Sequence, residues 1–211
     1  MSEYTSCPNC GSTIKSGLIS SVTILEKAAI AVINEYHTEK HDAYCTKCGM
    51  KLFEKYSEQL RAEKANLTSK LGKQLHLIPI VSCHTPLHWD YLSIGIVTGQ
   101  SVTGTGAFAE FASAWTDFLG KQSGAYNDKI RGGENLCFAQ LRKQTLDRGG
   151  NAILAVDIDY SELGGLKGMI MVCMTGTAVT LKNVDLFGSD RAMQLEDLKR
   201  INQRIQYLEK L

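Results

Sequence analysis

Apolar side chains recur with a helical period towards both ends of this 211-residue chain. Near the N-terminus they follow steps of three and four residues from Val22 to Tyr36, which predicts a helix over much of 20–36. Residues 51–73 are mostly charged helix formers with an incomplete apolar seam, and this pattern predicts a helical spacer exposed to water. Residues 189–211 predict an amphipathic helix, with an a/d seam formed by Leu198, Ile201, Ile205 and Leu208.

The middle of the chain combines strand patterns with helix patterns. Runs rich in β-branched apolar residues predict strands at 77–83, 91–98, 152–160 and 169–181. A helix is predicted over 134–148, because Gly149-Gly150 is a typical C-terminal stop. Another buried helix is predicted before it from aromatic residues at helical spacing: Phe108, Phe111, Trp115 and Phe118.

Cysteine spacing gives the strongest chemical signal. Seven cysteines without a secretory signal are better explained as metal ligands and buried thiols than as disulfides. Two pairs share the pattern C-x-x-C-G, in which a tight turn presents two thiolates to one ion and the glycine lets the backbone fold back. The four ligands predict a closed tetrahedral Zn site, which is structural because it leaves no position for water or substrate. These ligands are Cys7, Cys10, Cys45 and Cys48.

Two histidines leave the ligand set open. His37 and His41 have the H-x-x-x-H spacing of a zinc-finger second half, just before Cys45. A site formed by Cys7, Cys10 and the two histidines is therefore an alternative. A site formed by the two C-x-x-C-G pairs, here called knuckles, is the simpler interpretation. The histidines then belong to a solvated helix end.

Two further features are weaker candidates for a functional site. The glycine-rich stretch 99–106 lies between a predicted strand and a predicted helix, but it lacks the acidic residue of a dinucleotide fingerprint and the Gly-Lys-Ser/Thr of a phosphate loop. We interpret it as a strand-to-helix connection. Asp157 and Asp159 share one face of a strand with Ile153 and Ala155, so they could bind a cation or act as an acid/base pair. Pairing with a neighbouring Lys or Arg is the simpler role.

The remaining cysteines have less specific surroundings. Cys83-His84 with His88 forms a loose metal-like group that lacks a clear fourth ligand. Cys137 and Cys173 fall on apolar positions, which predicts buried thiols.

Four stretches of the central region resemble the YbjQ family of small bacterial proteins, which are often labelled heavy-metal-binding. The stretches occur in the family's order and cover about half the chain, from near Ile78 to Lys182. They are 95–99, the helix preceding 120–126, 151–160 and 172–178. The resemblance implies an antiparallel sheet wrapped on helices and a ring-shaped homo-oligomer, commonly a pentamer. It implies no chemical activity, and its metal label does not transfer to Asp157 or Asp159.

The resemblance also raises an expectation about one helix. Gly132-Gly133 interrupts a helix that is usually continuous in the family, so we expect altered local geometry there. The whole chain is then an α+β protein, with an N-terminal zinc-ribbon-like module and a C-terminal helix. The expected segments are the module with a helical insertion at 1–50, a charged helical linker at 51–75, an oligomerising YbjQ-like domain at 76–183 and the amphipathic helix at 184–211.

Composition narrows the classes of partner. Lys and Arg number 23 against 22 Asp and Glu, which is too neutral for nucleic-acid binding through bulk charge, and 44% hydrophobic residues argue against disorder. The 51–73 spacer has a local excess of positive charge, so nucleic acid stays a weakly supported partner. No apolar run approaches the ~18–20 residues of a membrane span, and a signal peptide is not recognisable. We therefore expect a cytoplasmic protein without membrane association.

Two functions from different classes follow. The first is a non-enzymatic, zinc-containing ring that displays zinc ribbons and helices to a protein or nucleic-acid partner. The alternative is an enzyme or a small-ligand or metal-binding protein with pockets at subunit boundaries, near Asp157, Asp159 and the 99–106 stretch. The seam of the C-terminal helix would pack on a neighbouring subunit, on another tail, on the 51–73 helix or back on its own domain.

Overall fold

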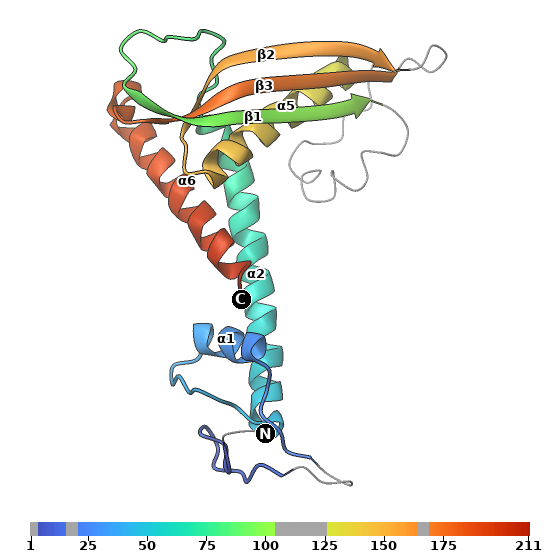
Figure 1. Ribbon diagram of the computed structural model, residues 1–211, viewed down its shortest axis with the longest axis vertical. Helices are drawn as coiled ribbons and strands as arrows, with labels where there is room; N and C mark the ends of the chain where they lie inside the picture. The colour runs from blue at the N-terminus through green and yellow to red at the C-terminus, as the bar shows by residue number, and fades with distance from the viewer. Residues whose placement is uncertain (1–3, 16–20, 104–125, 164–168) are drawn as a thin grey trace. The chain divides into compact units, whose positions relative to one another are not determined.

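The computed structural model describes residues 4–15, 21–103, 126–163 and 169–211. It is an α+β structure with a small antiparallel sheet, as predicted (Figure 1). The elements are α1 Lys27–Tyr36, α2 Thr46–Gln74, η1 Leu75–Leu77, β1 Tyr91–Thr103, α5 Tyr126–Asp147, β2 Ala152–Leu163, β3 Met169–Leu181, η2 Val184–Phe187 and α6 Ser189–Leu208. None of the described helices is long and apolar enough to cross a membrane.

The chain divides into two compact units. The first unit consists of Met1–Leu67 and Ile205–Leu211, and the second of Thr68–Arg204. The four-segment division expected from the sequence stays a prediction, and each unit is described by itself below.

The first unit is built around α1 and the N-terminal part of α2. Its core contains Val32, Ile33, Tyr44 and Tyr56, and their neighbours include Leu25 and Leu60. The helix predicted over much of 20–36 is α1, which begins at Lys27. The residues before it are held extended instead, because Leu25 N donates to Tyr44 O and Thr46 N donates to Thr23 O, at 2.9 and 2.8 Å. Backbone pairing with the segment before α2 thus replaces the first turns of the predicted helix.

The second unit contains the three-stranded antiparallel sheet, in the order β1-β3-β2. The predicted strand 169–181 agrees with β3, and the other two strands begin where predicted but extend further, to Thr103 and Leu163. α5 covers one face of the sheet (Figure 1). On β3 the side chains of Ile170, Val172 and Met174 are buried, and they alternate with less buried neighbours, as expected for a sheet with one covered face.

Close approach between α5 and the sheet explains two sequence expectations that were wrong. A Cβ at Gly99 would lie 2.7 Å from Cys137 O, so this glycine lets the helix backbone reach the strand, and β1 continues through it. The turn predicted from Gly99 therefore starts no earlier than the end of β1. Its remainder, with Gly104, Gly106 and the predicted aromatic helix of Phe108, Phe111, Trp115 and Phe118, lies outside the described residues. Likewise α5 runs unbroken through Gly132-Gly133, where a Cβ on Gly133 would meet Ser101 and Val172 at 3.2 Å.

The predicted strand 77–83 is also absent from the named strands. Its residues lie beside β2 through an isolated parallel bridge between Ile80 and Ile153, with Val81 N donating to Ile153 O and Ile153 N donating to Pro79 O. Because Pro79 has no N–H, the pairing cannot continue before it. After Ile80 the bulge in β2 shifts the register, so that Val156 N donates to Val81 O and Ala155 N donates to Cys83 O without forming a regular ladder.

The outer edge of β1 is covered by α5 side chains. The Gln140 amide donates to Gln100 O and accepts from Gln100 N, at 3.2 and 2.8 Å, and Gln144 makes the same pair of bonds with Thr98. Four residues further along the chain, directly after the end of α5, Arg148 donates to Ile96 O. Side chains four residues apart on the helix thus satisfy the backbone groups that an edge strand leaves unpaired.

α6 buries its apolar seam within the chain. The predicted a/d residues Leu198, Ile201, Ile205 and Leu208 are all buried, together with Leu195. Their burial needs no second subunit or coiled-coil partner.

Candidate metal centre

Four cysteine thiols meet in the first unit. The Sγ atoms of Cys7, Cys10, Cys45 and Cys48 all lie within 4.8 Å of one another. Cys7 Sγ is 3.7 Å from Cys48 Sγ, and Cys10 Sγ is 3.6 Å from Cys45 Sγ. These are the four residues whose spacing predicts the Zn site, and the fold brings together pairs that are about forty residues apart in the sequence.

The local backbone presents each pair differently. Cys7 and Cys10 lie on a turn closed by Gly11 N donating to Cys7 O at 2.9 Å, and Gly11 has a φ of +70°, which favours glycine. Cys45 precedes α2 and Cys48 lies in its first turn. Gly49 is helical, and a Cβ there would lie 2.5 Å from Leu25 Cδ1 and 2.9 Å from Tyr44 Cβ. The first glycine therefore serves backbone geometry, whereas the second serves close packing against the core.

Three of the sulfur separations fit a tetrahedral ion closely. With a Zn–S distance of about 2.3 Å, two sulfurs on a tetrahedron are ~3.8 Å apart. The distances of 3.6 Å for Cys10–Cys45 and 3.7 Å for Cys45–Cys48 are close to that edge length and far from a disulfide bond of about 2.05 Å. The cysteines are free thiols. Their arrangement is therefore suited to a metal ion, with four sulfur ligands and a closed coordination sphere.

Two of these thiols have strongly shifted pKa values. Hydrogen bonds from the side chain and backbone of Ser12 lower the pKa of the exposed Cys10 to about 6. Burial is the largest effect on Cys48 and raises its pKa to about 12, although the Asn9 side chain opposes this shift. A bound cation would stabilise the Cys48 thiolate against burial. Asn9 and Ser12 were not identified from the sequence, where the only available signal is their position within or beside the first knuckle.

The histidine alternative has no support in the described residues. His37 Nδ1 lies 3.0 Å from the Tyr56 hydroxyl, and His41 Nε2 is 4.0 Å from a Glu39 carboxylate oxygen. Within the described ranges, the set of three or more side chains able to share an ion contains the cysteines and neither histidine. The histidines instead contact the aromatic core, since His41 stacks edge-on against Tyr44 at 5.6 Å between ring centroids.

The carboxylates predicted as a second candidate lie on the sheet and are exposed. Asp157 is opposite Thr175 and Asp159 is opposite Cys173 in the β2–β3 register. A bulge between Leu154 and Asp157, with Ala155 at a φ of +51°, breaks the alternation that would place them beside Ile153. The described residues provide no third metal-binding group near them.

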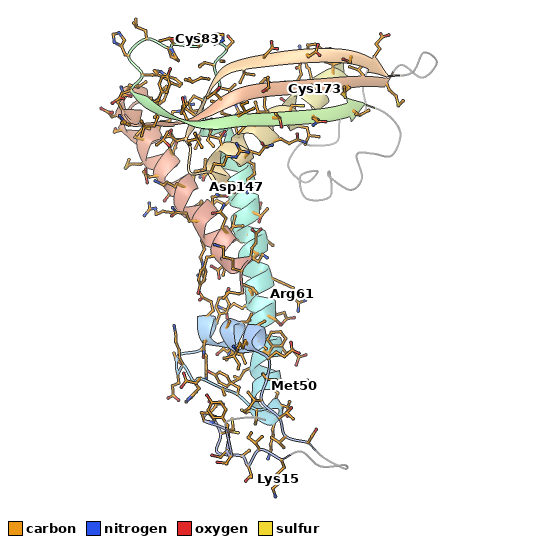
Figure 2. All side chains as sticks on the ribbon, viewed as in Figure 1. Lys15, Met50, Arg61, Cys83, Asp147 and Cys173 are labelled. Carbon is orange, nitrogen blue, oxygen red and sulfur yellow. The ribbon has the colours of Figure 1, made fainter. Side chains whose placement is uncertain are left out.

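The other predicted cysteine groups do not form a site. Cys83 lies on the loop before β1, and Cys173 lies within β3 (Figure 2). Cys83, His84 and His88 are exposed and do not join a ligand cluster in the described parts of the chain. Cys137 is fully buried as predicted, and burial raises its pKa to about 12. Cys173 is only half-buried.

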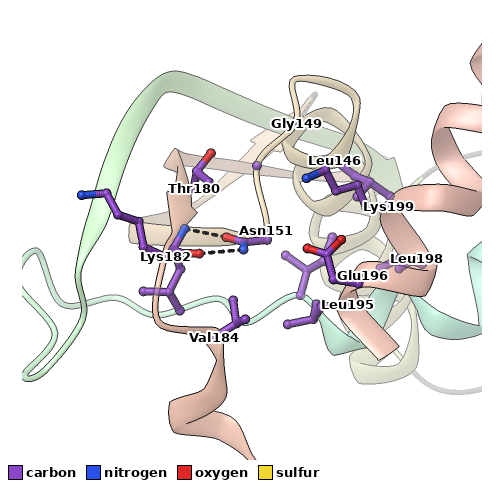
Figure 3. A pocket seen from close by; sticks show the side chains of 13 residues that line it. Leu146, Gly149, Asn151, Thr180, Lys182, Val184, Leu195, Glu196, Leu198 and Lys199 are labelled. Atoms are coloured by element: carbon purple, nitrogen blue, oxygen red, sulfur yellow. Dashed lines mark hydrogen bonds between the residues drawn. The ribbon is translucent and has the colours of Figure 1, made fainter. Parts of the chain in front are cut away.

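A small cavity in the second unit bears on the alternative of an enzyme. It has a volume of about 120 Å³ and lies between the end of α5, β3 and α6 (Figure 3). Two of its polar residues are already in use: the Asn151 amide bonds to both Leu181 N and Leu181 O, at 2.7 and 2.9 Å, and Lys182 pairs with Asp90 at 3.1 Å. We see in its lining no nucleophile with an adjacent base among the described residues.

Comparison with known proteins identifies the central part of the chain. The YbjQ family model, described as "Putative heavy-metal-binding", matches residues 91–182. UPF0145 proteins of Actinobacillus pleuropneumoniae serotype 5b strain L20 and serotype 3 strain JL03 are each 38% identical over 88 residues, which is 42% of this chain and 83% of theirs. The cysteine centre lies outside the matched region, so the argument for a metal there depends on its own geometry.

A solved structure was also found. It is the crystal structure of a DUF74-family protein of unknown function from Pediococcus pentosaceus, which covers 49% of this chain and 96% of its own length. The two chains are 10% identical and the TM-score is 0.30, so this similarity supports no conclusion about the present chain.

Proposed function

Because this chain belongs to the YbjQ family through residues 91–182, we propose that it is a non-enzymatic, zinc-containing assembly protein. In this proposal YbjQ-like domains form a ring, commonly pentameric in the family, and the ring displays several copies of the zinc module. The free thiols suit a reducing compartment, so a cytoplasmic location is part of the proposal.

The observation that carries the zinc assignment is the four-sulfur geometry. Thiolate ligands and sulfur separations of 3.6 to 3.7 Å favour Zn over harder ions such as Mg or Ca. Cys7 and Cys45 are buried, so the ion would lie between the backbone turn and the start of α2. With four sulfur ligands there is no open position, which makes a structural role the proposed one.

Exposed apolar side chains support the ring. Leu92, Ile94 and Ile96 of β1 are 60%, 37% and 68% exposed in the single chain. A strand with several large exposed apolar side chains is typical of a surface that another subunit covers. In a ring, each copy would contribute one zinc module, and several modules bound together would strengthen an individually weak contact with a protein or nucleic-acid partner.

Metal analysis tests the zinc centre. We expect purified protein to contain about one Zn per chain by inductively coupled plasma mass spectrometry, and Cys45→Ser to lose most of it, because three thiolates no longer close the tetrahedron. Cys83→Ser is the matched control, since this cysteine is exposed and lies outside the cluster. Well under one Zn per chain in the unmodified protein, or unchanged Zn in Cys45→Ser, would show that the assignment is wrong.

Light scattering tests the ring separately. We expect a mass several times the 23.2 kDa of one chain, and a shift towards monomer in Ile96→Lys because a charge would be buried in the contact. Leu87→Lys is the control, since Leu87 is 81% exposed on the loop before β1. A monomeric mass for the unmodified protein at micromolar concentration contradicts the ring and leaves the zinc assignment untouched.

A further inference from the structure

Two arginines of the second unit bind the same short backbone segment. Arg142 Nε, from α5, donates to Ile78 O at 3.0 Å. Arg191 Nη2, from the first turn of α6, donates to Leu77 O at 2.9 Å. Each guanidinium also lies over an aromatic ring, Arg142 at 5.8 Å from Phe138 and Arg191 at 5.1 Å from Phe187. Neutral groups thus hold both guanidinium groups in place.

Neither guanidinium forms an ion pair with a carboxylate among the described residues. Both side chains are half-buried, and Arg191 Nε is buried without a hydrogen-bond acceptor. Burial, with the nearby charge of Arg191 as the second cause, lowers the pKa of Arg142. Two like charges held partly out of water would be stabilised by an anion.

A groove with an apolar wall opens beside Arg142. It has a volume of about 320 Å³ and is lined by Ile80, Ser82, Phe138, Arg142, Val156 and Ile158. Segment 79–83 forms one wall, because its backbone is hydrogen-bonded to β2 at Ile153 and Val156. The bulge at Ala155, with its left-handed backbone, lies directly before Val156. It therefore changes the direction of β2 at the point where Val156 lines the groove.

We propose that this groove binds a small molecule in which a carboxylate is joined to an apolar body. The Arg142 guanidinium recognises the carboxylate, because its planar fork matches two carboxylate oxygens. The apolar body lies on Ile80, Val156 and Ile158, and the exposed Ser82 lies at the groove surface. This site is separate from the cysteine centre and requires neither bound zinc nor a particular oligomeric state.

Calorimetric titration of the zinc-loaded chain with octanoate tests the proposal. We expect saturable binding, and binding at least about tenfold weaker for octanamide, which keeps the apolar chain without the charge. Inorganic phosphate, which has charge without an apolar chain, should also bind at least about tenfold more weakly. The proposal is wrong if octanamide or phosphate binds as well as octanoate, or if octanoate gives no saturable heat at millimolar concentration.

Two pairs of variants locate the binding. Arg142→Gln should weaken octanoate binding about tenfold or more, whereas Arg200→Gln, which removes an exposed arginine of α6, should not. Because Arg142 also holds Ile78 O, Ser82→Asp provides a second test at an exposed position. Its carboxylate would compete for Arg142 and weaken binding, while the neutral Ser82→Asn of similar size would not. Equal affinities for the Asp and Asn variants, or unchanged affinity in folded Arg142→Gln, contradict the proposal.

Discussion

Burial determines how the thiols outside the cysteine centre can react. Cys137 on α5 is fully buried, with its Sγ donating to Val172 O at 3.4 Å, whereas Cys83 on the loop before β1 is exposed. The thiolate is the reactive form of cysteine, so both access to reagent and pKa matter. For Cys137 the two act in the same direction, because burial excludes the reagent and raises the pKa to about 12.

We therefore predict selective alkylation of zinc-loaded protein by iodoacetamide at pH 8. Cys83 should be modified rapidly and Cys137 only after unfolding, as measured by peptide mass spectrometry over time. Urea-unfolded protein is the control in which both sites react. Equal rates at Cys83 and Cys137 in the folded protein would contradict the burial of Cys137.

The same pKa shift sets the direction of a pH effect on stability. The folded pKa of Cys137 is about 12 and the ordinary value is 9.0, so the folded state holds the proton more tightly than the unfolded state. Its contribution to stability is present below pH 9 and is lost as the pH rises from there towards 12. Cys137→Ala should therefore lose less of its free energy of unfolding than the unmodified protein as the pH rises above 9.

At the residue level, spacing alone identified the four cysteines that the fold brings together. Each C-x-x-C-G pair can be recognised from a few consecutive residues. One metal ion bound by both pairs then explains why the same pattern occurs twice. Arg142 could not be found in this way, since its significance depends on its hydrogen bond to Ile78 O and on its forming no ion pair with a carboxylate of the described residues. Burial without a charged partner is a property of the folded chain, and no sequence pattern near Arg142 reports it.

Helix α5 depends on how closely its backbone approaches the sheet. Its two adjacent glycines have different surroundings: a Cβ on Gly132 meets nothing within 4 Å, whereas one on Gly133 meets side chains at 3.2 Å. Opposite the helix, a Cβ on Gly99 would clash with the backbone of Cys137 at 2.7 and 2.9 Å. Backbone atoms cannot rotate away as a flexible side chain can, so Gly99 has the strictest requirement of the three.

We predict opposite effects from alanine at Gly132 and Gly99. Gly132→Ala should stabilise the protein by roughly 0.5–1 kcal/mol, because alanine loses less backbone entropy in a helix. Gly99→Ala should destabilise it by about 1–3 kcal/mol, because the helix must move off the sheet. Urea unfolding followed by circular dichroism measures both, and a destabilised Gly132→Ala or an unaffected Gly99→Ala would contradict this account of α5.

Sequence periodicity predicted strands better than it predicted the boundaries of other elements. The run 169–181 lies in the middle of the sheet, where both edges are paired, and its predicted and observed ends agree. The helix predicted over much of 20–36 is observed at Lys27–Tyr36, and it starts no earlier because residues 23–25 pair with the segment before α2, a contact between distant residues. The strand over 77–83 was wrong because Pro79 lacks the N–H that would continue the pairing before it, and the bulge in β2 breaks the register after Ile80. These two differences arise where a tertiary contact or a single proline overrides a local pattern.

At the scale of the whole chain, the two units differ in what stabilises them. The second unit has a sheet, a covering helix and an apolar core that includes Leu154 and Val179. The first unit has a small core around Ile33 and Tyr44, and the cysteine centre lies next to it, since Cys48 packs against that core. Small domains with limited cores commonly depend on a metal for stability. In the proposed zinc form, the binding energy of the ion therefore contributes to the folding of the first unit and much less to the second.

We predict that removing the metal unfolds the first unit selectively. After treatment with a strong zinc chelator, peptides from α1 and the N-terminal turns of α2 should lose protection in hydrogen exchange, because four unpaired thiolates or thiols no longer hold residues 7–10 against 45–48. Peptides from β3 and α5 should keep their protection, since their core contains none of the four ligands. Restoring Zn should restore protection in the first unit, and Mg, which prefers oxygen ligands, should not. Equal loss of protection in β3 would mean that the units do not fold separately, and unchanged protection in α1 would mean that the ion does not stabilise the first unit.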